Sequence, residues 1–178
     1  DAGAKAYPKV NSNSLYLQAG AGIGTAANFV EVSTGTLRAL AERNIELEAV
    51  QGSQNPTGSM NVDLVKSILG DVSLKSRRGS IVSANDNIVV DVVIGNNITL
   101  QALNTIGTLE HHLNVSTAYS TPQTSLSTSS GGNTYITKLV GDLYLNTLAT
   151  QGGVAFVTVP AGSIRNGNKT GIDPADLT

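Results

Sequence analysis

The feature that most constrains the fold is an internal repeat. Residues 15–34, LYLQAGAGIGTAANFVEVST, align without a gap with residues 98–117, ITLQALNTIGTLEHHLNVST. Nine of these twenty positions are identical. Residues 70–81 resemble residues 152–164 more loosely, with one insertion. Because self-similarity at a fixed distance is typical of repeat architectures, we predict two stacked units of about 83 residues.

A shorter pattern recurs inside each unit. A turn residue is followed by two apolar residues that alternate with variable ones, and then by a small residue. Such alternation places the apolar side chains on one face of a β-strand. The copies are SLYLQA (14–19), NIELEA (44–49), NVDL (61–64), DVSLKS (71–76), NITLQA (97–102), DLYL (142–145) and GVAF (153–156), with related alternations at 30–33, 88–93 and 113–116.

One stretch, residues 36–50 (TLRALAERNIELEAV), carries two conflicting signals. Leu37, Leu40, Ala41 and Ile45 fall at helical spacing, whereas Ile45, Leu47 and Ala49 alternate with two glutamates. The segment NIELEAV aligns with NITLQAL at residues 97–103, which alternates strictly and contains β-branched residues. Since copies that stack must share one conformation, we predict a strand over residues 45–49. Residues 36–42 stay open between a helical turn and a loop.

The composition favours strands that coil around a narrow interior. Hydrophobic residues make up 40% of the 178 residues, but aromatic residues only 4%, and there is no Trp. A parallel β-helix fills its interior with Val, Ile, Leu and Ala and leaves little room for larger rings. We therefore predict an all-β chain, a parallel β-helix of short stacked strands with protruding loops.

The chain divides into three parts along its length. Residues 1–12 contain few apolar residues and read as a leader or linker, residues 13–164 form the predicted β-helix, and residues 165–178 read as a tail or a connector to further coils. Two segments inside the β-helix, residues 51–59 and residues 120–133, lie between apolar strands and are rich in turn-forming or small polar residues. We expect both to be loops that leave the stack.

Composition also excludes several classes of function. The net charge is −2, so there is no electrostatic footprint for nucleic acid, and we expect no nucleic-acid partner. The chain has no Cys, which excludes disulfides, thiol catalysis and cysteine-based zinc sites. No run approaches the ~18 apolar residues that a membrane-spanning helix needs.

The candidate metal ligands do not form a recognisable motif. His111 and His112 are neighbours, and neighbouring side chains on a strand point to opposite faces, so we expect no metal site there. Calcium stays an alternative, because aspartates occur at strand starts and in loops, but the nonapeptide calcium repeat is missing. These aspartates are Asp71, Asp86, Asp91, Asp142, Asp173 and Asp176.

Catalytic patterns are also missing from the sequence. There is no nucleophile elbow of the GxSxG type. Lys75 and Arg77 with Asp71 are the nearest candidate for polysaccharide cleavage, but the second unit replaces them with Val157 and apolar neighbours. We therefore predict no catalytic residues, no cofactor and no enzyme activity, and keep a polysaccharide lyase or hydrolase as the third alternative.

Several stretches resemble a known group of proteins. GDVSLKSRRGSI, GNNITLQALNTIGT, LNVST and GDLYLNTLATQGGVAFVTVPAGSI resemble the repeats of very large secreted bacterial surface proteins, the filamentous-haemagglutinin-like adhesins and related giant exoproteins. The resemblance covers about residues 13–164. It implies a right-handed parallel β-helix, an extracellular location at the bacterial cell surface and a stalk, fibre or adhesive role. The family has no catalytic residues in these repeats.

Two further expectations concern partners. The first strong strand, residues 15–18, carries the same motif as interior strands, so we predict that the chain adjoins further coils of a longer polypeptide or stacks end to end with copies of itself. The alternative function is binding of a glycan or another host ligand. The aromatic residues that could contact such a ligand are Tyr16, Tyr119, Tyr135 and Tyr144.

Overall fold

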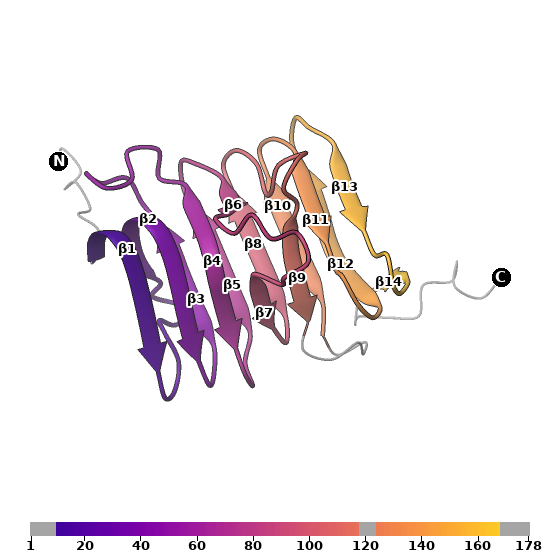
Figure 1. Ribbon diagram of the computed structural model, residues 1–178, viewed down its shortest axis with the longest axis horizontal. Helices are drawn as coiled ribbons and strands as arrows, with labels where there is room; N and C mark the ends of the chain where they lie inside the picture. The colour runs from indigo at the N-terminus through magenta and orange to yellow at the C-terminus, as the bar shows by residue number, and fades with distance from the viewer. Residues whose placement is uncertain (1–9, 118–123, 168–178) are drawn as a thin grey trace.

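The computed structural model describes residues 10–117 and 124–167, which form fourteen β-strands and no helix (Figure 1). The strands are β1 (Val10–Ala19), β2 (Val30–Ala41), β3 (Ile45–Ala49), β4 (Met60–Ser67), β5 (Val72–Ser76), β6 (Ile81–Ser83), β7 (Val93–Gly95), β8 (Ile98–Ala102), β9 (Leu113–Thr117), β10 (Leu126–Ser130), β11 (Thr134–Thr137), β12 (Leu143–Thr150), β13 (Ala155–Thr158) and β14 (Ile164–Asn166).

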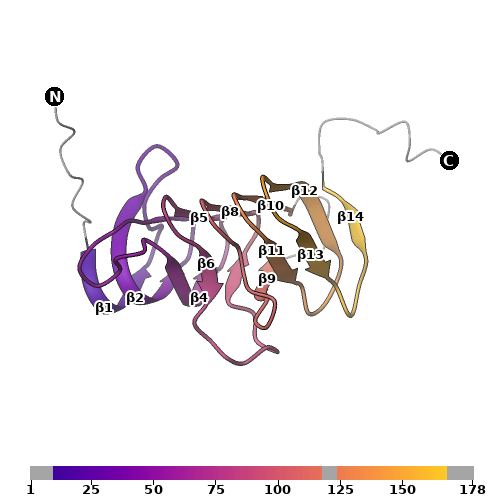
Figure 2. The same cartoon turned by 90° about the horizontal axis from the view of Figure 1, so that it is seen from above.

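All strand pairings are parallel, and the chain forms a β-solenoid of about seven turns. Strand β2 is long and joins two arms of one sheet. The first arm runs β3-β5-β8-β10-β12-β14, and the second runs β4-β7-β9-β11-β13. Figure 2 shows the two arms as separate rows along the length of the molecule. The all-β parallel fold predicted from the repeat is confirmed.

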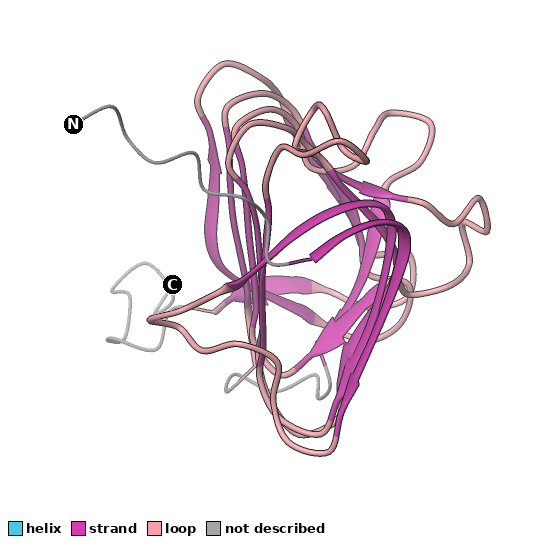
Figure 3. Ribbon diagram, turned by 90° about the vertical axis from the view of Figure 1, so that its left-hand side faces the viewer, coloured by secondary structure: helices cyan, strands magenta, loops and turns pink. Residues whose placement is uncertain are grey.

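Successive turns place equivalent residues side by side, as the view along the stack shows (Figure 3). On the first arm, Ile45 pairs with Val72, Val72 with Ile98, and Ile98 with Leu126. Near the C-terminal end, Leu143 pairs with Ile164, and the turn between them is shorter. The structural period is therefore a single turn, and the turns differ in length because their loops differ.

The interior consists of rows of aliphatic side chains. Leu47, Leu74 and Leu100 are neighbours on the first arm, and each is at most 1% exposed. A second row on the other arm contains Val65 and its successors in β7 and β9, all fully buried. Each side chain of this kind contributes about 1.5–3 kcal/mol by leaving water. The absence of Trp and the scarcity of Phe fit this narrow interior.

Three short elements match the predicted strand motif. Residues 45–49, 72–76 and 98–102 are β3, β5 and β8, so the alternating reading of residues 45–49 is confirmed. Residues 36–41 belong to β2 and are neither a helical turn nor a loop. They pair with β1 on one side and β4 on the other, and this pairing overrides their helical spacing.

Other local expectations differ from the structure. Residues 88–90 lie in an exposed loop, and only Val93–Gly95 forms a strand, because Asn114 bonds the carbonyl oxygens of Ile88 and Val90 and holds them outside the stack. Residues 51–59 are a loop as expected. The prediction of a loop at residues 120–133 is wrong for Leu126–Ser130, which form β10 because they pair with β8 and β12, and residues 120–123 lie outside the described residues.

The boundary segments contribute to the stack at their inner ends. Residues 10–12, within the segment read as a leader, pair with residues 32–34 of β2. Arg165 and Asn166, within the segment read as a tail, pair with β12. Residues 1–9 and 168–178 lie outside the described residues.

The two copies of the sequence repeat occupy different faces. Residues 15–19 lie in β1 and pair with the half of β2 that also pairs with β4. Residues 98–102 form β8, on the opposite arm. The repeat therefore encodes a local backbone path that the solenoid uses on more than one face.

Candidate functional site

Both copies of the repeat build the same protruding loop. Each loop begins at an isoleucine that bridges to the next turn, Ile23 to Ile45 and Ile106 to Thr134. The following glycines, Gly24 and Gly107, have φ angles of 72° and 68°. Each loop closes with a short turn, in which the amide of Thr25 donates to the carbonyl oxygen of Asn28 and that of Thr108 to His111, at 3.0 and 2.9 Å. We call these segments the first loop (residues 24–29) and the second loop (residues 107–112).

Each loop stands beside one outward-facing residue of the following turn. The amide of Glu46 donates to the carbonyl oxygen of Ile23 and that of Tyr135 to Ile106, both at 2.7 Å. Glu46 is 4% exposed and Tyr135 is 9% exposed, although both alternate with interior residues. The loops therefore enclose one side chain each on the outer face, a carboxylate in the first copy and a phenol ring in the second.

The two glycines are required by this arrangement. A Cβ atom on Gly24 would clash with the carbonyl oxygen of Glu46, and a Cβ atom on Gly107 would clash with that of Tyr135, because both would lie closer than 3.0 Å. Their positive φ angles also disfavour any other residue. The Gly20–Gly24 region therefore serves as a corner of the coil.

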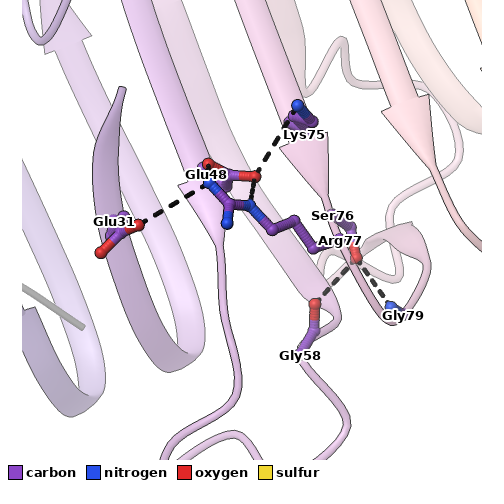
Figure 4. A network of polar contacts seen from close by, with 7 residues as sticks. All are labelled: Glu31, Glu48, Gly58, Lys75, Ser76, Arg77 and Gly79. Atoms are coloured by element: carbon purple, nitrogen blue, oxygen red, sulfur yellow. Dashed lines mark hydrogen bonds and ion pairs between the residues drawn. The ribbon is translucent and has the colours of Figure 1, made fainter. Parts of the chain in front are cut away.

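Next to the first loop lies a group of charged side chains, Glu31, Glu48, Lys75 and Arg77, which we call the charged cluster (Figure 4). Glu48 is 3% exposed and is bound by the guanidinium of Arg77 through both Nε and Nη2. The ammonium of Lys75 lies 4.0 Å from Glu48, and Arg77 Nη2 lies 3.8 Å from Glu31. The hydrogen bond to Glu48 raises the pKa of Arg77. The cluster thus neutralises a buried carboxylate.

Glu46 itself lies outside this ion-pair network. Its burial raises the pKa of the carboxyl group, against a smaller opposing effect of a hydrogen bond with Ser73. Its Oε2 atom is buried and has no hydrogen-bond partner within the described part of the chain. The first loop therefore covers an acid that is costly to ionise where it lies.

The candidate cleavage residues are not assembled. Lys75 and Arg77 both face Glu48, whereas Asp71 accepts hydrogen bonds from the amide and the side chain of Asn97 at 2.9 and 3.0 Å. Asp71 precedes Lys75 by four residues on an extended strand, a distance of about 13 Å at the usual rise. These three groups do not converge on one substrate position.

Next to the second loop lies a group of ring side chains, His112, Tyr135 and Phe156, which we call the aromatic cluster. The His112 ring centroid is 5.6 Å from that of Tyr135 and 5.3 Å from that of Phe156, which it meets edge-on. His112 Nδ1 lies 2.9 Å from Thr137 Oγ1, and burial lowers the pKa of His112. Asn133 Nδ2 donates to the Tyr135 hydroxyl at 3.2 Å. Phe156 remains 54% exposed.

The tyrosines predicted to contact a ligand do not share one surface. Tyr16 is 54% exposed and bonds Gln18 at the N-terminal end of the solenoid. Tyr144 is half-buried on β12, in the other arm from Tyr135. Tyr119 lies outside the described residues. His112 and Phe156, which the fold brings to Tyr135, were not among the residues predicted to contact a ligand.

Metal ligands do not gather in the described residues, where no group of three or more His, Asp or Glu side chains lies close enough to hold an ion. The Asp142 carboxylate accepts hydrogen bonds from the Ser163 amide at 2.8 Å and from Arg165 at 2.5 Å. His111 and His112 do not converge, since His112 packs into the aromatic cluster. Asp173 and Asp176 lie outside the described residues.

One lysine is enclosed in the solenoid. Lys138 is 2% exposed, and its ammonium donates to Thr117 Oγ1 at 3.2 Å and to the Thr117 carbonyl oxygen at 3.4 Å. Burial lowers the pKa of Lys138, and the negative charges of Asp91 and Asp142 oppose that effect. Burial also raises the pKa of Asp91. Lys138 and Asp91 are therefore ionisable side chains that lie in a mostly aliphatic interior.

The two ends of the stack are open within the described residues. Strand β1 pairs only with β2, β13 only with β11, and β14 only with β12 (Figure 1). Two large apolar side chains on the C-terminal end strands, Phe156 and Ile164, are 54% and 52% exposed. Residues 10–30 and residues 151–164 contain no Asp, Glu, Lys or Arg. Within the described residues, both ends therefore present strand edges with few charged side chains, and Arg165 on β14 is paired with Asp142.

Comparisons with known proteins identify no relative. No protein-family model matches the chain, and neither a curated protein nor a solved structure matches it. Among the described residues there is no helix long and apolar enough to cross a membrane.

Proposed function

We propose that this chain is a structural segment of a secreted bacterial fibre, filament or adhesin at the cell surface, and that its solenoid continues by end-to-end stacking. The proposal rests on the ends of the stack, which within the described residues are open and carry few charged side chains. An unpaired strand edge is a template for another strand, and natural proteins block such edges with charges, prolines or covering segments when they are not used. Strands β1, β13 and β14 carry one charged side chain, Arg165.

The surface and the strand motifs support the same assignment. Charged residues make up only 13% of the chain, about half the usual share, and the outer rows consist largely of Ser, Thr, Asn and Gln. The strand motifs resemble those of the filamentous-haemagglutinin-like adhesins. A polar, weakly charged rod that repeats along its axis fits a stalk or fibre whose role is to span distance.

The interior rows define how a second copy would stack. Val157 pairs with Ile136, and Ile136 pairs with Leu113. Successive strand pairings connect Leu17 of the first turn with Val115, through Ala39, Val65 and Val93. Leu15 lies two residues before Leu17, as Leu113 lies two residues before Val115, so Leu15 occupies in the first turn the position that Leu113 occupies in its own. Stacking in this register would place Val157 beside Leu15 of a second copy.

Sedimentation velocity and electron microscopy of the isolated chain test the proposal. We expect the mean sedimentation coefficient to rise with concentration and ordered filaments one solenoid wide to form. The variant Ala155→Lys with Ile164→Lys places charge on both C-terminal edges and should remain monomeric. Ser129→Lys, on the outer face of β10, is the matched control and should assemble like the parent. A chain that stays monomeric at every concentration would contradict the proposal.

A further inference from the structure

We infer that the aromatic cluster is a binding site for a neutral oligosaccharide, with the exposed ring of Phe156 as the platform on which a sugar ring stacks. This inference goes beyond the structural role, because it adds a ligand to the outer face of the rod. The observation behind it is that three ring side chains lie close together. The chain contains two Phe and five Tyr, and the fold places one of each beside the second loop together with a histidine.

The rings are held in fixed positions. Tyr135 pairs with Phe156 across neighbouring turns, so their side chains leave the same face of the sheet. His112 touches both rings and is fixed in turn by the contact of its Nδ1 with Thr137, 2.9 Å away. Asn133 anchors the Tyr135 hydroxyl at 3.2 Å. Little side-chain freedom remains to be lost when a ligand binds, which favours affinity.

Tyr135 and Phe156 differ in solvent exposure, and the difference suits a binding platform. Tyr135 is 9% exposed and supports the cluster from below, whereas Phe156 is 54% exposed. The carbon-bound hydrogens on one face of a sugar ring carry partial positive charge, and the face of an aromatic ring is electron-rich. Phe156 therefore offers the kind of surface that a pyranose ring covers.

The polar groups around the platform favour a neutral ligand. Thr137 and Thr158 pair across the same two turns and lie two residues along the strands from Tyr135 and Phe156, on the same face. Hydroxyl groups both donate and accept hydrogen bonds, as sugar hydroxyls do. Strands β9, β11 and β13 contain no Asp, Glu, Lys or Arg. A charged polysaccharide would find no partner for its charges on these strands.

Isothermal titration calorimetry tests the inference with three neutral probes: hexamers of β-1,4-glucose, α-1,4-glucose and β-1,4-N-acetylglucosamine. We expect saturable binding of at least one of them. Phe156→Ala should weaken binding at least tenfold, whereas Phe156→Tyr should retain it. Tyr144→Ala is the matched control, because Tyr144 is an aromatic residue on β12, in the other arm from Tyr135 and Phe156, and it should leave binding unchanged.

Several results would overturn the inference. They are no binding of any neutral hexamer, equal losses in Phe156→Ala and Tyr144→Ala, or binding only of a hexamer of galacturonic acid. Circular dichroism of each variant separates loss of the site from loss of the fold. Because a second copy stacked on β13 would lie beside Phe156, the titrations are run below the concentration at which sedimentation shows assembly, so that their outcome does not depend on stacking.

Discussion

The first and second loops follow the same backbone path but cover different side chains. Gly24 and Gly107 have φ angles within a few degrees of each other, and the turn hydrogen bonds after them match. Yet the first loop encloses the carboxylate of Glu46, and the second encloses the ring of Tyr135. The covered residue belongs to the next turn and lies outside the repeat. The repeat therefore fixes the loop, while the neighbouring turn decides the chemistry beneath it.

Removing the shared glycines should have the largest effect. Gly24→Ala and Gly107→Ala each force a methyl group against a carbonyl oxygen of the next turn and strain a positive φ, so we expect each to lower the free energy of unfolding by about 3 kcal/mol. Gly20→Ala, with no atom within 4 Å of the added carbon, should change it by less than about 0.5 kcal/mol. Urea denaturation gives all three values. Equal stability of Gly20→Ala and Gly24→Ala would contradict the shared role of the loops.

In the charged cluster, removal of Arg77 should lower the free energy of unfolding more than removal of the charge of Glu48. Arg77→Met leaves the buried carboxylate of Glu48 without its main partner and should cost about 2 kcal/mol. Glu48→Gln leaves an arginine whose side chain is 53% exposed to water, and should cost less than about 1 kcal/mol. Thermal and urea denaturation of both variants measure the difference. A larger cost for Glu48→Gln would show that the arginine, not the carboxylate, depends on the pair.

The acid beneath the first loop should give the smallest effect, with a defined dependence on pH. Burial raises the pKa of Glu46 in the folded chain above its ordinary value of 4.5. Between this ordinary pKa and the raised pKa of the folded state, the folded chain therefore binds more protons than the unfolded chain. Its contribution to stability is therefore full below pH 4.5 and is lost as the pH rises through the folded-state pKa. Glu46→Gln should stabilise the chain by about 1 kcal/mol at pH 7 and by almost nothing at pH 4. Equal effects at both pH values would contradict this account.

The alternation of apolar residues in the sequence was enough to predict those strands whose paired neighbours alternate in the same way. The alternation in residues 45–49, 72–76 and 98–102 predicts β3, β5 and β8 because these three strands pair directly with one another. Residues 88–90 are apolar and belong to a stretch expected to be a strand, but they lie in a loop, where the side-chain amide of Asn114 from another turn donates to the carbonyl oxygens of Ile88 and Val90. The periodicity of apolar residues gives no information about a contact of this kind between turns.

The candidate sites were harder to predict than the strands. Glu46 and Glu48 have the spacing of exposed positions, and only a loop from the preceding turn and an arginine from the following one bury them. The pairing of Tyr135 with Phe156 depends on the length of a single turn, whereas the sequence repeat revealed only a much longer unit that spans several turns. A search for rings separated by one turn would have found this pair once the turn length was known.

The most direct test of the central claim, that the ends of the solenoid pair with one another, uses the absence of Cys in the chain. Thr158 of one copy should lie beside Tyr16 of the next, one position beyond Val157 and Leu15. Chains carrying Thr158→Cys and Tyr16→Cys are treated with dibromobimane, a short thiol cross-linker, alone and as an equal mixture. The account predicts cross-linked dimers in the mixture and none in either variant alone. No dimer in the mixture, or dimers within a single variant, would contradict head-to-tail stacking.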